Sequence, residues 1–220
     1  MIDRKRELLE RYEKHGIVRS EEVKKAFLKV PREEFVLDPY KPYAYDDRPL
    51  PTLRGQTMSA PHMHLILLEA LELRRGMKVL EVGTGTGYQA ALIAEIVGPE
   101  GKVITIERIR ELAKIAEENL KRLGYKNVKV IRGDGLKGYP PEAPYDRILI
   151  TAAVKEIPKA LIEQLKPTGI LVAPVIEDYR NQRLIRIRKT PEGRIKKERL
   201  MPVLFVEARE GIEKRLTRTR

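Results

Sequence analysis

Hydrophobic residues recur at helical spacing near the start of the chain. Leu8 and Tyr12 share a face of one expected helix, and Val23 and Phe27 share a face of a second, for which Ser20 is the expected N-cap. Residues 31–61 then show no sustained period and are rich in proline. A stretch of this length predicts a long ordered loop, which serves either as a lid or as a rigid connector.

From residue 61 onward, short apolar runs alternate with helical segments. Strands are expected over 78–82, 102–107, 128–133, 145–151 and 169–175, with helices that begin at Pro61, cover 88–97, end at Leu123 and cover 158–165. This order is typical of right-handed βαβ units and predicts an α/β fold with a doubly wound, mostly parallel sheet.

After residue 175 the helical segments stop. The runs 182–188 and 201–208 flank a turn at 189–193, so an antiparallel strand pair should complete the sheet. We therefore expect one globular unit with three parts: N-terminal helices and a loop over 1–60, an α/β core over 61–180, and C-terminal strands with a basic tail over 181–220.

Charge and composition narrow the class of protein. The chain has 44 basic and 32 acidic residues, a net charge of +12, and 14 of the basic against five of the acidic residues lie after residue 179. No apolar run approaches the roughly 20 residues of a membrane span, and the N-terminus resembles no signal peptide, so we expect a soluble cytoplasmic protein without membrane contact. The absence of Cys excludes disulfides, zinc–thiolate sites and a thiol nucleophile. Scarce amides and 35% charged residues are typical of a thermophilic source.

The strongest chemical signal is a glycine-rich turn between the strand 78–82 and the next helix. Its sequence, Glu81-Val82-Gly83-Thr84-Gly85-Thr86-Gly87, has neither the dinucleotide spacing nor the P-loop ending. The next strand ends in Glu107, whose carboxylate suits a ribose diol, and the third is followed by Gly133-Asp134-Gly135, which suits an exocyclic amine. Acidic groups at three strand ends favour a cationic nucleoside without phosphate, and S-adenosylmethionine fits that description.

Two methyl acceptors are excluded by the sequence. Methylation of cytosine C5 needs a Cys nucleophile, which the chain lacks. Methylation of exocyclic base amines uses an Asn/Asp-Pro-Pro-aromatic motif after the fourth strand, where this chain reads LITAAV. Small molecules, protein carboxylates, and RNA riboses or ring nitrogens stay open as acceptors.

One segment points to a known family. GQTMSAPHMH, residues 55–64, resembles the signature of the protein-L-isoaspartate (D-aspartate) O-methyltransferases, and three further blocks extend the resemblance to roughly residues 15–206. It implies a Rossmann-like class I methyltransferase fold and, as product, S-adenosylhomocysteine. The family usually has an aromatic-Val-Pro-Leu run at the substrate edge, whereas this chain has Phe205-Val206-Glu207-Ala208.

The resemblance implies roles for individual residues. Ser59 matches the active-site hydroxyl, and the substrate contacts implied are Thr57, Met58, Ser59, His64 and Val206. The cofactor contacts implied are Glu81, Gly83, Thr84, Gly85 and Gly87 around the methionine end, Glu107 and Arg108 at the ribose, Asp134 and Gly135 at the adenine, and His64.

The implied reaction is methyl transfer to the side-branch carboxylate of isoaspartyl residues in damaged proteins and peptides, with D-aspartyl residues as further candidates. The ester then loses methanol to form a succinimide, whose hydrolysis partly restores aspartate. We expect a monomer, no metal because His62 and His64 lack the four-residue spacing of a helical metal pair, and no nucleic-acid partner. The alternatives are an RNA-binding module or RNA methyltransferase, suggested by the basic C-terminal segment, and a small-molecule methyltransferase.

Overall fold

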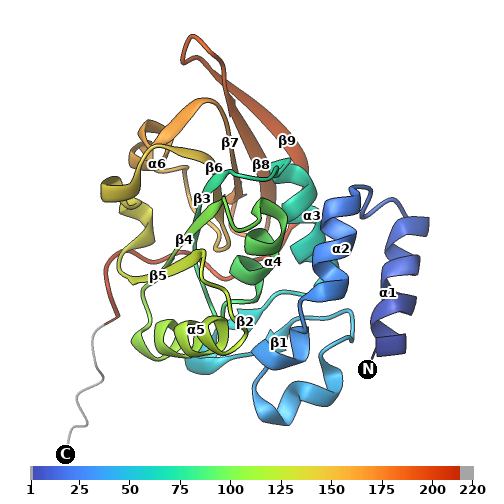
Figure 1. Ribbon diagram of the computed structural model, residues 1–220. Helices are drawn as coiled ribbons and strands as arrows, with labels where there is room; N and C mark the ends of the chain where they lie inside the picture. Colours follow the sequence, from blue (N-terminus) through green and yellow to red (C-terminus); the bar gives the residue numbers. More distant parts are fainter. Residues whose placement is uncertain (1, 214–220) are drawn as a thin grey trace, which may run out of the picture.

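The computed structural model describes residues 2–213 and has a single seven-stranded sheet at its centre (Figure 1). The strand order is β5-β4-β3-β6-β7-β8-β9; the first five are parallel and the last two are antiparallel to their neighbours. The strands are β3 (Lys78–Val82), β4 (Lys102–Glu107), β5 (Val128–Arg132), β6 (Tyr145–Ile150), β7 (Leu165–Ile176), β8 (Gln182–Lys189) and β9 (Ile195–Val203). The predicted doubly wound sheet with an antiparallel C-terminal pair is confirmed.

The helices divide unequally between the two faces of the sheet. They are α1 (Ile2–Lys14), α2 (Glu21–Lys29), α3 (Pro61–Leu71), α4 (Tyr88–Val97), α5 (Arg110–Arg122) and α6 (Lys159–Glu163). α3, α4 and α5 cover one face, α2 packs outside α3 and α4 with α1 beside it, and α6 lies on the other face. None of the helices within residues 2–213 is long and apolar enough to cross a membrane.

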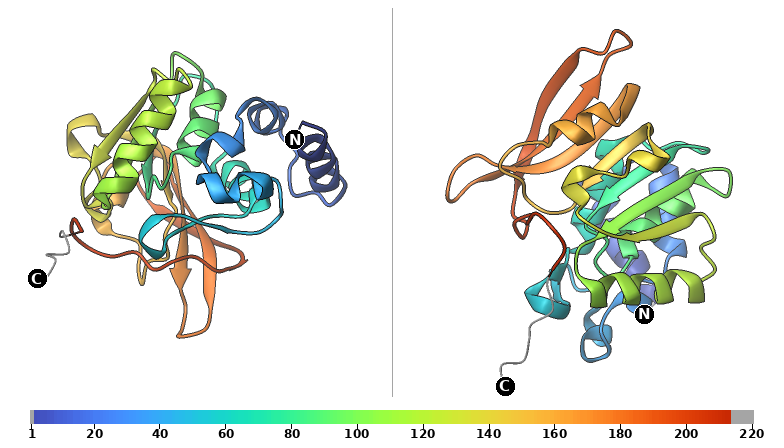
Figure 2. Two further views of the ribbon diagram at one scale, coloured as in Figure 1. Left: turned by 90° about the horizontal axis from the view of Figure 1, so that it is seen from below. Right: turned by 90° about the vertical axis from the view of Figure 1, so that its left-hand side faces the viewer.

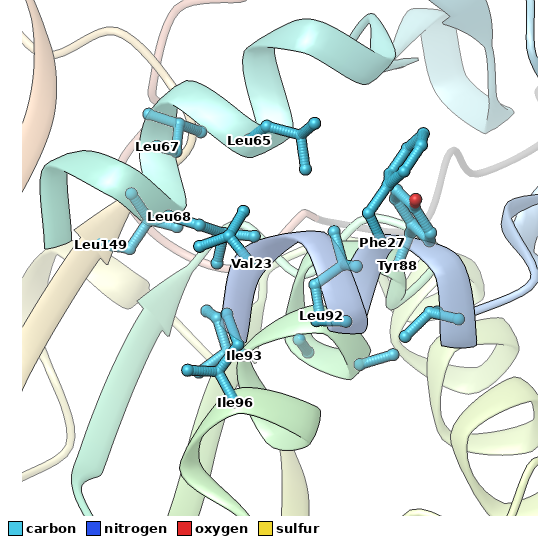
Figure 3. Close-up of a cluster of buried hydrophobic side chains, with 14 of the residues drawn as sticks. Val23, Phe27, Leu65, Leu67, Leu68, Tyr88, Leu92, Ile93, Ile96 and Leu149 are labelled. Atoms are coloured by element: carbon cyan, nitrogen blue, oxygen red, sulfur yellow. The ribbon is translucent and has the colours of Figure 1, made fainter. Parts of the chain in front are cut away.

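The larger core cluster lies between the sheet and the N-terminal helices. Figure 3 shows part of it, where Val23 and Phe27 of α2 meet Leu65 of α3 and Leu92 of α4. α4 is buried almost all round because α2 covers the side that faces away from the sheet. The N-terminal segment is therefore part of the same folded body as the α/β core.

The proline-rich stretch after α2 is ordered by short elements. It contains the 3-10 helices η1 (Arg32–Phe35), η2 (Asp38–Tyr43) and η3 (Leu53–Gly55), and the two-stranded sheet of β1 (Leu50–Pro51) and β2 (Thr57–Met58). Two further 3-10 turns, η4 (Gly135–Lys137) and η5 (Pro140–Glu142), connect β5 to β6.

The bounds of the last strand differ from the prediction. The last strand spans Ile195–Val203 rather than 201–208, because pairing with β8, which places Ile195 opposite Lys189, sets its length and recruits polar residues. Ser20 is the N-cap of α2 as predicted, and its hydroxyl donates to the Glu69 carboxylate at 2.6 Å rather than to a backbone atom of the helix. Ala60 is the N-cap of α3. The part of the predicted basic tail after residue 213 lies outside the described residues.

Candidate active site

A cavity with about 730 Å³ of empty space opens at the carboxyl edge of the parallel strands. It brings together seven of the predicted site residues: Thr57, Gly83, Gly85, Glu107, Arg108, Gly135 and Val206. These residues come from five separate parts of the chain. Three parts lie at the ends of β3, β4 and β5, because the carboxyl ends of parallel strands share one edge of the sheet, and β2 and the C-terminal segment supply the other two.

The glycine loop is held against the end of β6. Gly83 has φ +99, and a Cβ there would lie 2.3 Å from Oγ1 of Thr151. That hydroxyl occupies the space because it donates to the Gly83 carbonyl at 2.7 Å. Gly87, at φ +98, is the N-cap of α4 and packs against Leu120. The loop therefore needs glycine both for its backbone conformation and for close packing.

Glu107 closes the cavity beside this loop. One carboxylate oxygen accepts a hydrogen bond from the Gly85 amide and the other from the Ile109 amide, both at 2.9 Å. Burial raises the pKa of the Glu107 carboxyl, and the amide donors oppose that effect. Since each oxygen keeps a free lone pair, the fixed carboxylate can still accept both hydroxyls of a ribose.

Glu81 lies beneath the loop and does not line the cavity. It is fully buried and accepts a 2.6 Å hydrogen bond from Thr105, whose hydroxyl is 2.6 Å from that of Thr84. Burial, followed by the negative charge of Glu107, raises the pKa of Glu81 to about 8. Glu81 and Thr84 thus support the glycine loop from the core side in this geometry.

This buried carboxyl predicts a pH-dependent stability. In the unfolded chain the Glu81 carboxyl has its ordinary pKa of 4.5, whereas in the fold it keeps its proton up to about pH 8. Between these values the folded state binds the extra proton, so the free energy of unfolding should fall as the pH rises. Glu81→Gln should lose less stability than the wild type between pH 5 and pH 9 in urea unfolding. Equal losses in both proteins would contradict this assignment.

The predicted acceptor residues follow one another on an extended segment. Thr57 is exposed and lines the cavity, Met58 is buried, and Ser59 is half-buried. Of these three predicted residues only Thr57 is part of the cavity lining; Met58 turns into the core, and Ser59 follows the end of β2. The Ser59 carbonyl accepts a hydrogen bond from Arg32, while its hydroxyl has no hydrogen-bond partner within residues 2–213.

His64 is buried below this segment and does not line the cavity. It faces Gln89, to which its Nδ1 is hydrogen-bonded, and its ring packs edge-on against Tyr88 at 4.9 Å between centroids. Burial, followed by the positive charge of Arg32, lowers the pKa of His64 to about 3. The ring is therefore neutral and lies behind Ser59 rather than in the open space.

The C-terminal segment 204–213 crosses the carboxyl edge beside the loop that carries Thr57 (Figure 2). Val206 accepts from the Ala153 amide at 2.8 Å. Asp134 accepts from the Gly211 amide at 2.9 Å, and Arg108 donates to the Gly211 carbonyl at 3.1 Å. Asp134 itself does not line the cavity. Its contact with Gly211 instead fixes the C-terminal segment near the predicted adenine end.

Several lining residues were missed in the sequence. Ile109 is the N-cap of α5, Leu112 lies in its first turn, and Leu136 follows the Gly-Asp-Gly turn. Their position just after predicted contacts was an available signal for an apolar wall. The others lie in or next to segments already quoted from the sequence, although none of them was predicted as a contact; they are Gln56, Val82, Ile106, Thr151, Ala152, Glu207, Ala208 and Arg209.

Two alternatives can be located on the structure. His62 is hydrogen-bonded to Asp47 at 2.7 Å, and no group of three or more metal-ligating side chains gathers within residues 2–213. On the basic β8–β9 ribbon, Arg186 and Arg188 both form ion pairs with Glu72 and Glu198. Much of that ribbon's charge is therefore used within the protein.

Comparisons with known proteins agree with this geometry. Residues 3–213 match the family model described as Protein-L-isoaspartate(D-aspartate) O-methyltransferase (PCMT). A protein-L-isoaspartate O-methyltransferase of Ignicoccus hospitalis is 57% identical, covering 94% of this chain and 97% of its own, and one of Pyrococcus horikoshii is 53% identical, covering 94% and 96%.

Solved structures point the same way. One protein-L-isoaspartate O-methyltransferase has a TM-score of 0.85 at 34% identity, with 93% of this chain and 65% of that chain covered. A Plasmodium falciparum protein, described as a putative protein-L-isoaspartate O-methyltransferase in complex with S-adenosyl-L-homocysteine, has a TM-score of 0.80 at 30% identity, with 92% and 97% covered.

Proposed function

The chain belongs to the protein-L-isoaspartate(D-aspartate) O-methyltransferase family, and on that premise we propose how its residues transfer a methyl group from S-adenosylmethionine to an isoaspartyl carboxylate. The observation that carries the proposal is the cavity, because it is lined both by the Glu107 carboxylate and by the segment that leads to Ser59. A nucleoside held by Glu107 would therefore face a carboxylate held by that segment.

The residues present fit S-adenosylmethionine. Glu107 is fixed by two amides with lone pairs left for the ribose, and the apolar side chains of Ile109 and Leu112 form a wall of the same space. When bound, S-adenosylmethionine would supply a methyl group on a positively charged sulfur. An ionised carboxylate could accept that methyl group, with the sulfur as the leaving group, without a general base. The protein then has only to hold the two reactants at the correct distance and angle.

Ser59 is proposed as the residue that orients the acceptor. Its backbone is fixed through the carbonyl, while the hydroxyl is free to donate to one carboxylate oxygen and leave the other to react. Thr57, two residues earlier and part of the cavity lining, is proposed as a second contact of the isoaspartyl group, and Val206, which lines the same cavity, as a further contact.

Ser59→Ala is expected to lower kcat on the order of 10-fold or more, because one positioning hydrogen bond is lost from the reacting geometry. The dissociation constant of S-adenosylmethionine should stay within twofold of wild type, since Ser59 is not part of the cavity lining that contains Glu107. Steady-state kinetics and calorimetric titration check both values. A large loss of cofactor affinity would contradict the proposed role.

The finer properties of the enzyme are also proposed here. We propose that it acts as a monomer in the cytoplasm. We also propose a thermophilic source, which the scarce amides and the 35% charged residues support. Acceptance of D-aspartyl residues is proposed from the family description alone.

The acceptor class is tested by offering the purified protein methyl-labelled S-adenosylmethionine with an isoaspartyl peptide, with total RNA, or with a mixture of small carboxylic acids. Label should enter the peptide as a base-labile ester. Label in RNA alone, or in the small acids alone, would overturn the proposed acceptor.

A further inference from the structure

Arg32 is a fully buried arginine directly behind the acceptor segment. Its Nε donates to the Ala44 carbonyl and its Nη2 to the Ser59 carbonyl, both at 2.7 Å. The guanidinium thereby joins the proline-rich stretch after α2 to the residue proposed to orient the acceptor. Because the guanidinium is planar, these two hydrogen bonds fix the Ser59 backbone in direction as well as in distance.

The positive charge of Arg32 is not neutralised by an adjacent carboxylate. Within residues 2–213 it forms no ion pair, its Nη1 is buried without a hydrogen-bond partner, and its guanidinium lies 5.2 Å from the centre of the Tyr88 ring. Burial lowers the pKa of Arg32, which reflects the cost of keeping the charge away from water. A buried and unpaired cation is costly, and a neutral side chain could bridge the same two carbonyls.

The groups around Arg32 do not remove this charge. Tyr45 and Tyr88 have raised pKa values because they are buried, so both rings are neutral. His64 is also neutral, as its lowered pKa shows. The negative charge of Asp47 affects Arg32 only without direct contact, and its carboxylate accepts a hydrogen bond from the Tyr12 hydroxyl at 2.6 Å. Ser59 is thus backed by one uncompensated positive charge.

We propose that Arg32 is a positioning residue of the acceptor site, which fixes Ser59 from behind and favours binding of a negatively charged carboxylate in front of it. The proposal rests on the proposed function, since the acceptor there is an isoaspartyl carboxylate. In the complex the acceptor's negative charge would offset the cation that the free protein leaves unpaired. The charge should act mainly on KM for the peptide, because the carboxylate loses its charge as it becomes an ester.

The test compares Arg32→Met, which removes the charge, with Arg32→Lys, which retains a cation but not the planar fork. Arg147→Met is the matched control, because Arg147 is also a buried arginine that donates to backbone carbonyls, those of Leu71 at 2.6 Å and Glu72 at 3.2 Å, but lies away from the cavity. For each variant we would measure KM and kcat for an isoaspartyl peptide, the dissociation constant of S-adenosylhomocysteine, and the unfolding midpoint.

Arg32→Met should raise the peptide KM on the order of 10-fold or more, with the S-adenosylhomocysteine dissociation constant unchanged within twofold. In Arg32→Lys the increase in peptide KM should be at most half as large on a logarithmic scale. Arg147→Met should lower the unfolding midpoint without changing KM. Equal KM values for the two Arg32 variants would overturn the inference. So would a KM change in Arg32→Met that is no larger than the change in Arg147→Met.

If Arg32→Met does not bind S-adenosylhomocysteine, the test becomes the comparison of kcat and KM between Arg32→Lys and the wild type. A lowered kcat with KM changed less than threefold supports the inference, and any other pattern contradicts it. Failure of the wild-type protein to methylate the peptide would instead refute the proposed function, so the two failures are distinguishable.

Discussion

Gly83→Ala is expected to weaken S-adenosylmethionine binding on the order of 100-fold or more while the protein stays folded. A left-handed backbone costs a residue with a Cβ about 1–2 kcal/mol. In addition, the new Cβ would lie 2.3 Å from Oγ1 of Thr151, which is itself fixed by hydrogen bonds to the carbonyls of Val82 and Gly83. The loop must shift into the cavity or away from β6, and either movement removes the surface that the cofactor contacts.

Gly76→Ala is the matched control for this variant. Gly76 also has a positive φ, +79, but nothing lies within 4 Å of a Cβ built there, and it is outside the cavity lining. The control should therefore carry the backbone strain alone and bind S-adenosylmethionine normally. Calorimetric titration of both variants checks the expectation, and normal affinity in Gly83→Ala would show that the cofactor does not contact this loop.

Glu107→Ala is expected to raise the dissociation constant of S-adenosylmethionine on the order of 10- to 100-fold, since hydrogen bonds to a charged group contribute about 1.5–3 kcal/mol. The substitution removes the proposed ribose acceptor and also frees the Gly85 amide, which the carboxylate holds at 2.9 Å. At saturating cofactor, kcat should fall much less than affinity, because Glu107 is proposed to bind the ribose and not the reacting groups.

Glu117→Ala, on the exposed side of α5, is the control for the loss of a carboxylate near this site. It should leave cofactor affinity unchanged. Glu107→Ala with wild-type affinity, or with a kcat loss as large as its affinity loss, would contradict the ribose assignment.

The strands of the α/β core were predictable because they are buried on both faces. β3, β4 and β6 are short apolar runs because both faces of the sheet are covered, and glycines or polar turns end them. β9 was predicted with the wrong bounds because it lies at the edge of the sheet, where pairing with β8 rather than burial decides which residues become strand. The proline-rich stretch after α2 had no period to interpret, so its 3-10 helices appear only in the structure.

The candidate site was predictable where its residues adjoin strand ends. Gly83, Gly85 and Glu107 follow directly from the order of strands and line the cavity. The contacts of Asp134 with Gly211 and of Arg32 with Ser59 join distant parts of the chain, and no local pattern encodes them. Their partners are decided by how the loops pack over the sheet, which a sequence met alone does not reveal.

The central claim is that the protein methylates an isoaspartyl carboxylate at this cavity and distinguishes it from an ordinary aspartyl carboxylate. Two synthetic peptides, identical except that one aspartyl residue is linked through its side chain, test it most directly with methyl-labelled S-adenosylmethionine. Both peptides carry an ionised carboxylate, so only the geometry of the acceptor site can separate them. The account predicts kcat/KM for the isoaspartyl peptide at least about 100-fold above that for the aspartyl peptide; equal labelling of the two peptides would contradict it.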